Sequence, residues 1–258
     1  MQNIARTFAL LGKAPGTELH EDADRVWYLS GLPHLILNGV VEARYEGPDP
    51  EAWIDEALAP FRTRQLPMIW ITDPTSRPID LEERLLGRGL ERVADSPGMA
   101  VELAGVSDDL PPAVEIRRVD GDDVELERAM QLVTDVFEMP AFVGRYFLDL
   151  FGALPGELRD QVRNYVALVE GRLVGASSMF MLAGVAGMYN VVTAPDARRL
   201  GVGTALTARP LLEARAMGYR AGVLQSSEMG LSVYREIGFR ELCRVRWYTE
   251  TSGSNHPD

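Results

Sequence analysis

The chain contains the stretch YNVVTAPDARRLGVGTAL at residues 189–206, in which an apolar run passes through a loop into a helical pattern. Gly201 and Gly203 stand at the predicted helix start, where the first backbone N–H groups lack partners within the helix and the helix dipole is positive. Arg198 and Arg199 directly precede them and add positive charge. This pattern predicts a phosphate-binding loop. On these residues alone, a plain glycine turn with two solvated arginines is an equal alternative.

Two other phosphate-binding motifs do not fit this stretch. A P-loop is excluded, because Gly-x-x-x-x-Gly-Lys-Ser/Thr occurs nowhere in the chain. A Rossmann fingerprint would need a small residue where Leu206 stands, and a glycine much closer to the end of the strand at Thr193 than Gly201 is.

The flanking sequence predicts alternating strands and helices around this loop. A strand, helix, strand unit implies that the strand after the loop helix lies parallel to the strand before it. The expected elements are a helix capped by Asp122 and ended by Pro140, a helix over 142–151, strands over 165–169, 173–181 and 188–193, a helix over 202–217, a strand over 221–225, a short helix ended by Gly238, and a strand over 244–249.

One proline falls inside the predicted helix over 202–217. Pro210 cannot donate the hydrogen bond that its position in a helix requires. We therefore predict a bend over 206–210.

The N-terminal half repeats part of this pattern. The elements predicted between residues 26 and 103 follow the order strand, helix, strand, helix, glycine, strand. The elements predicted over 188–249 have the same order. This order predicts a diverged internal duplication. Pro111 and Pro112 stop both helix and strand between the halves. We therefore expect an N-terminal domain at 1–105, a linker at 106–113, a second domain at 114–250 and a frayed tail at 251–258.

Composition narrows the class of protein. The 258 residues are 46% hydrophobic and 25% charged, which is typical of a soluble globular chain. The formal net charge of −12 opposes binding to nucleic acid. Cys243 is the single cysteine, and no Cys/His spacing predicts a metal site. No stretch has the length of a membrane span or the pattern of a signal peptide, so we expect a cytoplasmic protein without membrane contact.

Two motifs carry a family resemblance. RRLGVG at 198–203 resembles the signature Arg/Gln-x-x-Gly-x-Gly/Ala of the GNAT (GCN5-related N-acetyltransferase) superfamily, and SEMGLSVYREIGF at 227–239 is similar to that family's Asn-x-x-Ala-x-x-x-Tyr-x-x-x-Gly-Phe helix. The resemblance covers about 114–250. It implies an α/β (α+β) fold, in which a mixed central sheet is flanked by helices, and two GNAT-like domains. The first of these domains lacks the signature, so we expect it not to bind CoA.

The resemblance also implies the cofactor, acetyl-CoA, and the residues that hold it. Backbone groups of three strand residues would pair with the pantetheine arm, and the loop would surround the pyrophosphate. Ser227 replaces the family's usual asparagine. The implied cofactor-binding residues are Val191, Val192, Thr193, Arg198, Arg199, Leu200, Gly201, Val202, Gly203, Thr204 and Ser227.

The resemblance implies that Tyr234 protonates the departing CoA thiolate, a task that suits a weakly acidic phenol. The alternative for Tyr234 is a packing role in the core. Glu228 and Glu138 are candidates to accept a proton from the attacking amine, and the alternative for each is a plain solvated carboxylate.

The implied function is N-acetyltransfer from acetyl-CoA to a primary amine, of a small molecule, by direct attack in a ternary complex. The alternatives are a non-catalytic acyl-CoA-binding sensor or assembly module, and an acetyltransferase that acts on a protein N-terminus or lysine. Loops near 137–146 and 182–187 would select the acceptor but carry no substrate-specific motif. The acceptor, the acyl length and the oligomeric state stay open, with a homodimer as one alternative.

Overall fold

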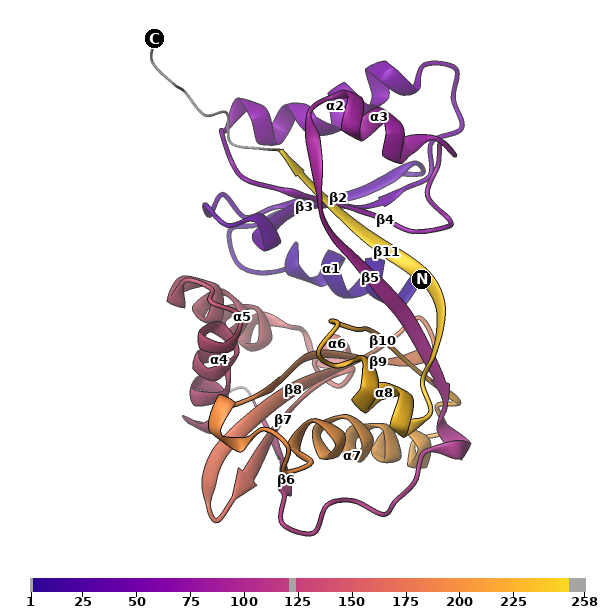
Figure 1. Cartoon of the computed structure of the whole chain (residues 1–258). Coiled ribbons are helices and arrows are strands. Elements are labelled where there is room, and N and C mark those ends of the chain that lie inside the picture. The colour runs from indigo at the N-terminus through magenta and orange to yellow at the C-terminus, as the bar shows by residue number, and fades with distance from the viewer. Residues whose placement is uncertain (1, 121–123, 251–258) are drawn as a thin grey trace. The chain divides into compact units, whose positions relative to one another are not determined.

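The structure is a computed structural model and describes residues 2–120 and 124–250 (Figure 1). Asp122, the expected helix cap, and the predicted tail at 251–258 lie outside the described residues.

The chain forms two compact units. The first unit comprises Phe8–Ser96 and the described residues from Cys243 onward, and the second comprises Gln2–Thr7 and the described residues of Pro97–Leu242. These limits differ from the predicted division at 105 and 114. The reason is that two long strands, β5 (Leu90–Glu102) and β11 (Arg240–Glu250), each begin in one unit and end in the other.

The second unit is built on a sheet with the strand order β5-β10-β9-β8-β7-β6. β6, β7, β8 and β9 form an antiparallel meander, whose last three strands are those predicted over 165–169, 173–181 and 188–193. β10 is parallel to β9, as expected. Helix α7 packs on one face of the meander and α4 on the other (Figure 1). The elements are η2 Leu103–Gly105, β6 Glu115–Val119, α4 Val124–Val136, α5 Ala141–Ala153, α6 Gly156–Arg159, β7 Val162–Val169, β8 Arg172–Leu182, β9 Val185–Thr193, η3 Pro195–Ala197, α7 Val202–Ala216, β10 Ala221–Gln225 and α8 Leu231–Ile237.

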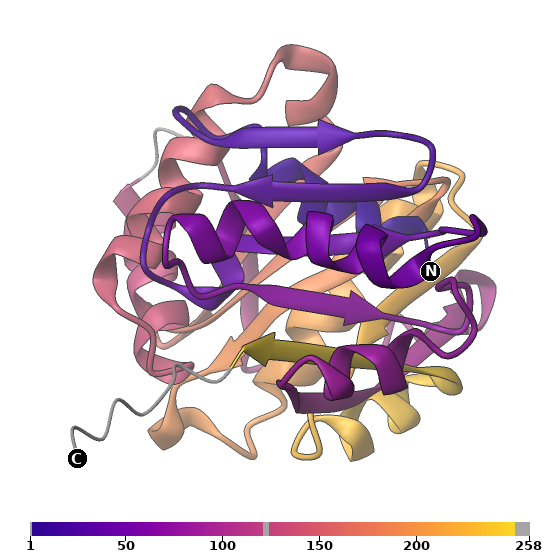
Figure 2. The same ribbon diagram turned by 90° about the horizontal axis from the view of Figure 1, so that it is seen from above.

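The first unit has the strand order β1-β2-β3-β4-β11-β5. Its helix α2 buries one face, which includes Ile54, Leu58 and Phe61, in a core with Trp70. Figure 2 shows this helix lying over the strands of the unit. The elements are α1 Gln2–Leu11, whose first six residues belong to the second unit, β1 Glu18–Glu21, β2 Arg25–Leu29, η1 Leu35–Leu37, β3 Asn38–Ala43, α2 Pro50–Thr63, β4 Ile69–Thr72 and α3 Leu81–Gly87.

The last strands of the two halves are exchanged between the units. β4 pairs with β11, in the register Ile71 opposite Trp247, and β10 pairs with β5, in the register Val223 opposite Ala100. Both halves nevertheless keep the predicted element order. In each half, a glycine with a left-handed φ follows the last helix. Gly89, at φ 83°, follows α3, and Gly238, at φ 108°, follows α8.

A serine from the sheet compensates for the proline inside α7. Pro210 leaves the carbonyl oxygen of Leu206 without its helical donor, and the hydroxyl of Ser177 on β8 donates to that oxygen at 2.9 Å. Ser177 is buried, and its hydroxyl takes the place that a water molecule would otherwise have to fill as donor to Leu206. The predicted bend near Pro210 stays a prediction.

Replacing Ser177 with alanine should lower the free energy of unfolding by about 1–3 kcal/mol, because the buried oxygen of Leu206 then has no donor. The double variant Ser177→Ala/Pro210→Ala should recover much of this loss, since an alanine at position 210 restores the helical N–H. Urea unfolding of the wild type and the variants measures both effects. A double variant no more stable than Ser177→Ala would contradict this account.

Candidate functional site

Strand β9 separates from β10 at the centre of the second unit. Their parallel pairing ends where Met188 lies opposite Leu224. On its other side, β9 pairs with β8 and contains a bulge. Tyr189 lies opposite Ser178 and Val192 lies opposite Ala176, so β9 has one residue more than β8 between these two pairs. Asn190 lies inside this bulge with a left-handed φ of 52°. The bulge and the separation of the strands free the end of β9 from regular pairing with β10.

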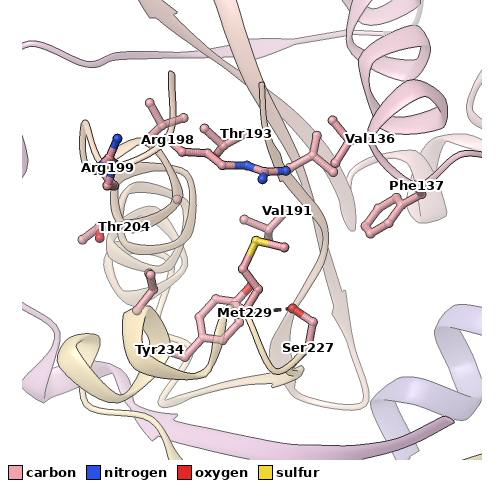
Figure 3. Close-up of a pocket in the computed structure, with 16 residues that line it drawn as sticks. Val136, Phe137, Val191, Thr193, Arg198, Arg199, Thr204, Ser227, Met229 and Tyr234 are labelled. Atoms are coloured by element: carbon pink, nitrogen blue, oxygen red, sulfur yellow. Dashed lines mark hydrogen bonds between the residues drawn. The ribbon is translucent and has the colours of Figure 1, made fainter. Parts of the chain in front are cut away.

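A cavity of about 400 Å³ opens between the separated strand ends (Figure 3). Apolar side chains make much of its wall, and the start of α7 closes one end. The lining residues are Val136, Phe137, Val191, Val192, Thr193, Arg198, Arg199, Gly201, Val202, Gly203, Thr204, Ser227, Met229, Gly230, Val233 and Tyr234. In Figure 3, Arg199 and Thr204 lie on the left of this cavity, Phe137 on the right, and Tyr234 and Ser227 below.

The start of α7 has the features of an anion site. Gly201 is its N-cap at φ 79°, no described side chain caps the helix, and its first turn contains no acidic residue. The first N–H groups of α7 are therefore left for a ligand. Arg199 has a left-handed φ of 66°, a conformation that costs about 1–3 kcal/mol and is typical of functional loops.

The two glycines of the loop have different steric roles. A Cβ on Gly201 would lie 2.6 Å from Cγ of Pro111, so no larger residue fits there. A Cβ on Gly203 would meet nothing closer than 3.9 Å, at Thr193 and Val233, which both line the cavity. The absence of a side chain at Gly203 therefore keeps the cavity open rather than the fold intact.

Tyr234 brings a phenol to the cavity from α8. The residue is 9% exposed, and its ring contacts that of Phe239 edge to face, with the ring centroids 5.9 Å apart. A Cβ on Gly230 would lie 2.8 Å from this ring, so the glycine makes room for it. Burial raises the pKa of Tyr234 to about 12. The phenol is therefore protonated at neutral pH and can donate a proton.

The structure brings most of the predicted site residues together. Tyr234 lines the cavity with every predicted cofactor-binding residue except Leu200, which is 49% exposed. Glu138 and Glu228 do not line it. Glu138 lies beyond the end of α4 with a left-handed φ of 53°, and both glutamates are exposed. The cavity therefore gives no support to either glutamate as a proton acceptor, and that role stays a prediction.

The sequence interpretation did not include five further residues of the cavity among the cofactor-binding residues. Val136, Phe137, Met229, Gly230 and Val233 line it as well. Phe137 is 46% exposed and Met229 is 70% exposed. Exposed large apolar side chains around a cavity indicate a surface that a ligand covers.

The corresponding turn of the first unit has the opposite chemistry. At the start of α2, the carboxylate of Asp49 accepts a hydrogen bond from the N–H of Ala52 at 3.0 Å. Pro50 has no N–H to offer, and Glu51 adds negative charge to the first turn. This helix start is already capped and repels a phosphate.

Two negative findings concern the described part of the chain. Within residues 2–120 and 124–250, no group of three or more His, Cys, Asp or Glu side chains could hold a metal ion. No helix in the same ranges is long and apolar enough to cross a membrane.

A family model described as an acetyltransferase (GNAT) domain matches residues 84–223, which is more than half of the chain. No curated protein matches the sequence.

Solved structures with a similar fold extend over almost the whole chain. A GCN5-related N-acetyltransferase from Kribbella flavida has a TM-score of 0.72 at 20% identity and covers 97% of this chain and 96% of its own. One from Sphaerobacter thermophilus has a TM-score of 0.62 at 18% identity, with 96% and 91% covered. A tandem GNAT protein from the clavulanic acid biosynthesis pathway has a TM-score of 0.61 at 15% identity, with 95% and 86% covered. These likenesses confirm the predicted α/β fold class with a mixed sheet flanked by helices.

Proposed function

Because the chain belongs to the acetyltransferase (GNAT) family, we propose that it transfers an acetyl group from acetyl-CoA to the primary amine of a small molecule, by direct attack in a ternary complex. One observation carries this proposal. A single cavity joins the uncapped start of α7 and two arginines, at one end, to the buried phenol of Tyr234. The formal net charge of −12 favours a cationic amine as the acceptor.

The cavity residues fit the cofactor. The N–H groups at the start of α7, with Arg198 and Arg199, would hold the pyrophosphate, since these amides have no capping side chain. The end of β9 from Val191 to Thr193 would hold the pantetheine arm with its backbone. Phe137 and Met229 would be covered by the same arm, which explains their exposure.

Bound acetyl-CoA supplies a thioester whose carbonyl carbon the neutral amine attacks. The bond from carbon to nitrogen forms and the bond from carbon to sulfur breaks. Tyr234 would donate its proton to the departing sulfur, the attacking nitrogen would lose a proton to solvent, and the Tyr234 phenolate would regain a proton from solvent. The raised pKa of Tyr234 keeps the phenol protonated for this step. Because Glu138 and Glu228 do not line the cavity, we expect neither to contact the amine directly.

The test is release of free thiol from acetyl-CoA across a panel of small amines, with lysine peptides and peptide N-termini as further acceptors. The proposal expects release that depends on a small amine. Binding of CoA with no acceptor-dependent release would indicate the sensor alternative, and release only with peptides would indicate a protein acetyltransferase. Either result would overturn the proposal.

We further propose a tandem arrangement with a single cofactor site, as the capped and acidic start of α2 suggests. The similar fold of a tandem GNAT protein supports the arrangement. Calorimetric titration with CoA should give one molecule bound per chain, and substituting Gly203 should remove that binding. A stoichiometry of two would refute the single site.

A further inference from the structure

A buried asparagine of the N-terminal helix belongs to the second unit. Asn3 is 3% exposed. Its Nδ2 donates to the carbonyl oxygens of Phe180 at 3.1 Å and Leu182 at 3.0 Å, with that of Val185 at 3.4 Å. Its Oδ1 accepts the hydroxyl of Tyr189 at 2.8 Å. The carboxamide thus ties the turn between β8 and β9 to a tyrosine further along β9.

The backbone is shaped to admit this side chain. A Cβ on Gly187 would lie 2.1 Å from Oδ1 of Asn3, so only glycine leaves room for the carboxamide at that point. Tyr189 is held from a second side by Phe180, whose ring meets it edge to face with centroids 5.3 Å apart. The phenol is therefore contacted from two sides, by Asn3 and by Phe180.

Tyr189 stands where the two strands separate. It follows Met188, the last residue of β9 that pairs with β10, and precedes the bulge at Asn190. Val191, directly after the bulge, lines the cavity. Any shift of Tyr189 would therefore move the bulge and the backbone that borders the cavity.

Tyr189 also adjoins the end of β10, because the preceding residue, Met188, pairs with Leu224. Burial raises the pKa of Tyr189 to about 12. The phenol is therefore a neutral donor at physiological pH. Gln225 ends β10 two residues before Ser227, which lines the cavity. Tyr189, which Asn3 holds, thus adjoins both strand ends that border the cavity.

We propose that Asn3 is a positioning residue for acetyl transfer, which holds Tyr189 and through it the bulged end of β9. This inference rests on the proposed function. A purely apolar packing role would not require a carboxamide whose donors and acceptor are all engaged, because an apolar side chain of similar shape could fill the same volume. Of the first turn of the N-terminal helix, the side chain of Asn3 alone then supports the site of the second unit.

The experiment is a double-mutant cycle with Asn3→Leu and Tyr189→Phe. Each change should lower kcat about tenfold and leave KM for acetyl-CoA within about twofold, since misplacement of reacting groups by less than 1 Å costs this much. The double variant should lose no more than either single variant, because both changes remove the same link. If the fold-losses in kcat of the two single variants multiply in the double variant, the two residues act independently and the proposal is overturned.

The control is Ile4→Ala, a change in the same turn at a residue that is 4% exposed. It should lower Tm but leave kcat per folded molecule unchanged. If Asn3→Leu and Ile4→Ala behave alike, Asn3 serves stability alone and the proposal fails. If Asn3→Leu does not fold, the kcat of Tyr189→Phe tests the proposal alone. A kcat equal to that of the wild type would overturn it. An active wild type with unaffected variants removes only this inference, whereas a wild type that acetylates no amine removes the proposed function.

Discussion

Replacing Gly203 with valine should weaken binding of acetyl-CoA about a hundredfold or more, which is about 2.7 kcal/mol, while the protein stays folded. The position allows this separation because a Cβ there meets only cavity-lining atoms of Thr193 and Val233, at 3.9 Å. The valine methyl groups would occupy the space that the pyrophosphate needs. Valine is also a better helix former than glycine, so α7 itself should not weaken. Calorimetry measures the affinity and circular dichroism the fold.

Gly152 offers a matched control for this substitution. It lies in helix α5 of the same unit, does not line the cavity, and a Cβ there would meet no atom within 4 Å. Gly152→Val should therefore leave the affinity for acetyl-CoA unchanged. If Gly203→Val binds the cofactor as the wild type does, the start of α7 is not the pyrophosphate site.

The second large effect concerns Tyr234. Tyr234→Phe should reduce kcat about a hundredfold, the usual contribution of a general acid, with the Kd of CoA within about twofold of the wild type. Phenylalanine keeps the edge-to-face contact with Phe239 and removes only the proton donor. Tyr165→Phe is the matched control, since Tyr165 is a buried tyrosine of the same unit that donates to Glu213 outside the cavity. Its kcat per folded molecule should be unchanged.

The pH dependence of the rate follows from the direction in which the pKa of Tyr234 is shifted. The pKa of Tyr234 is raised from 10.0 to about 12, so the proton-donating form persists to higher pH than in a free tyrosine. The rate should rise as the acceptor amine loses its proton and then stay level, with no loss attributable to Tyr234 below a pH of about 11. A decline in kcat of the wild type with an apparent pKa between 8 and 10, absent from Tyr234→Phe, would contradict this assignment.

The elements of the second unit could be predicted well because their signals are local. β10 has the predicted bounds 221–225, and α8 ends at Gly238, as its left-handed φ requires. The same local signals predicted the glycines at the start of α7. The short strand β1 and the helix α1 were not predicted. Much of α1 is buried, and Asn3 is a polar residue whose partners are some 180 residues away in sequence.

The candidate site shows the same division. The loop arginines, the two glycines and Tyr234 could be chosen from their spacing, because a phosphate site at a helix start is built within a few consecutive residues. Spacing in the sequence could not show whether the two candidate glutamates line the cavity. Glu138 and Glu228 stand next to cavity-lining residues in sequence, yet neither lines the cavity itself. Phe137 and Met229 gave no sign of their exposure, since exposure depends on what packs around a side chain.

The sequence by itself predicted the glycine loop at the start of α7, the order of strands and helices, and the absence of that loop from the first half. Each of these depends on residues close together in the chain, through hydrophobic periodicity, glycine conformation and helix capping. Only the tertiary structure decided that β5 and β11 exchange partners, that Ser177 satisfies the carbonyl freed by Pro210, and that Asn3 reaches Tyr189. These contacts join residues far apart in sequence, and the physical reason is that pairing and burial depend on which surfaces the whole chain brings together.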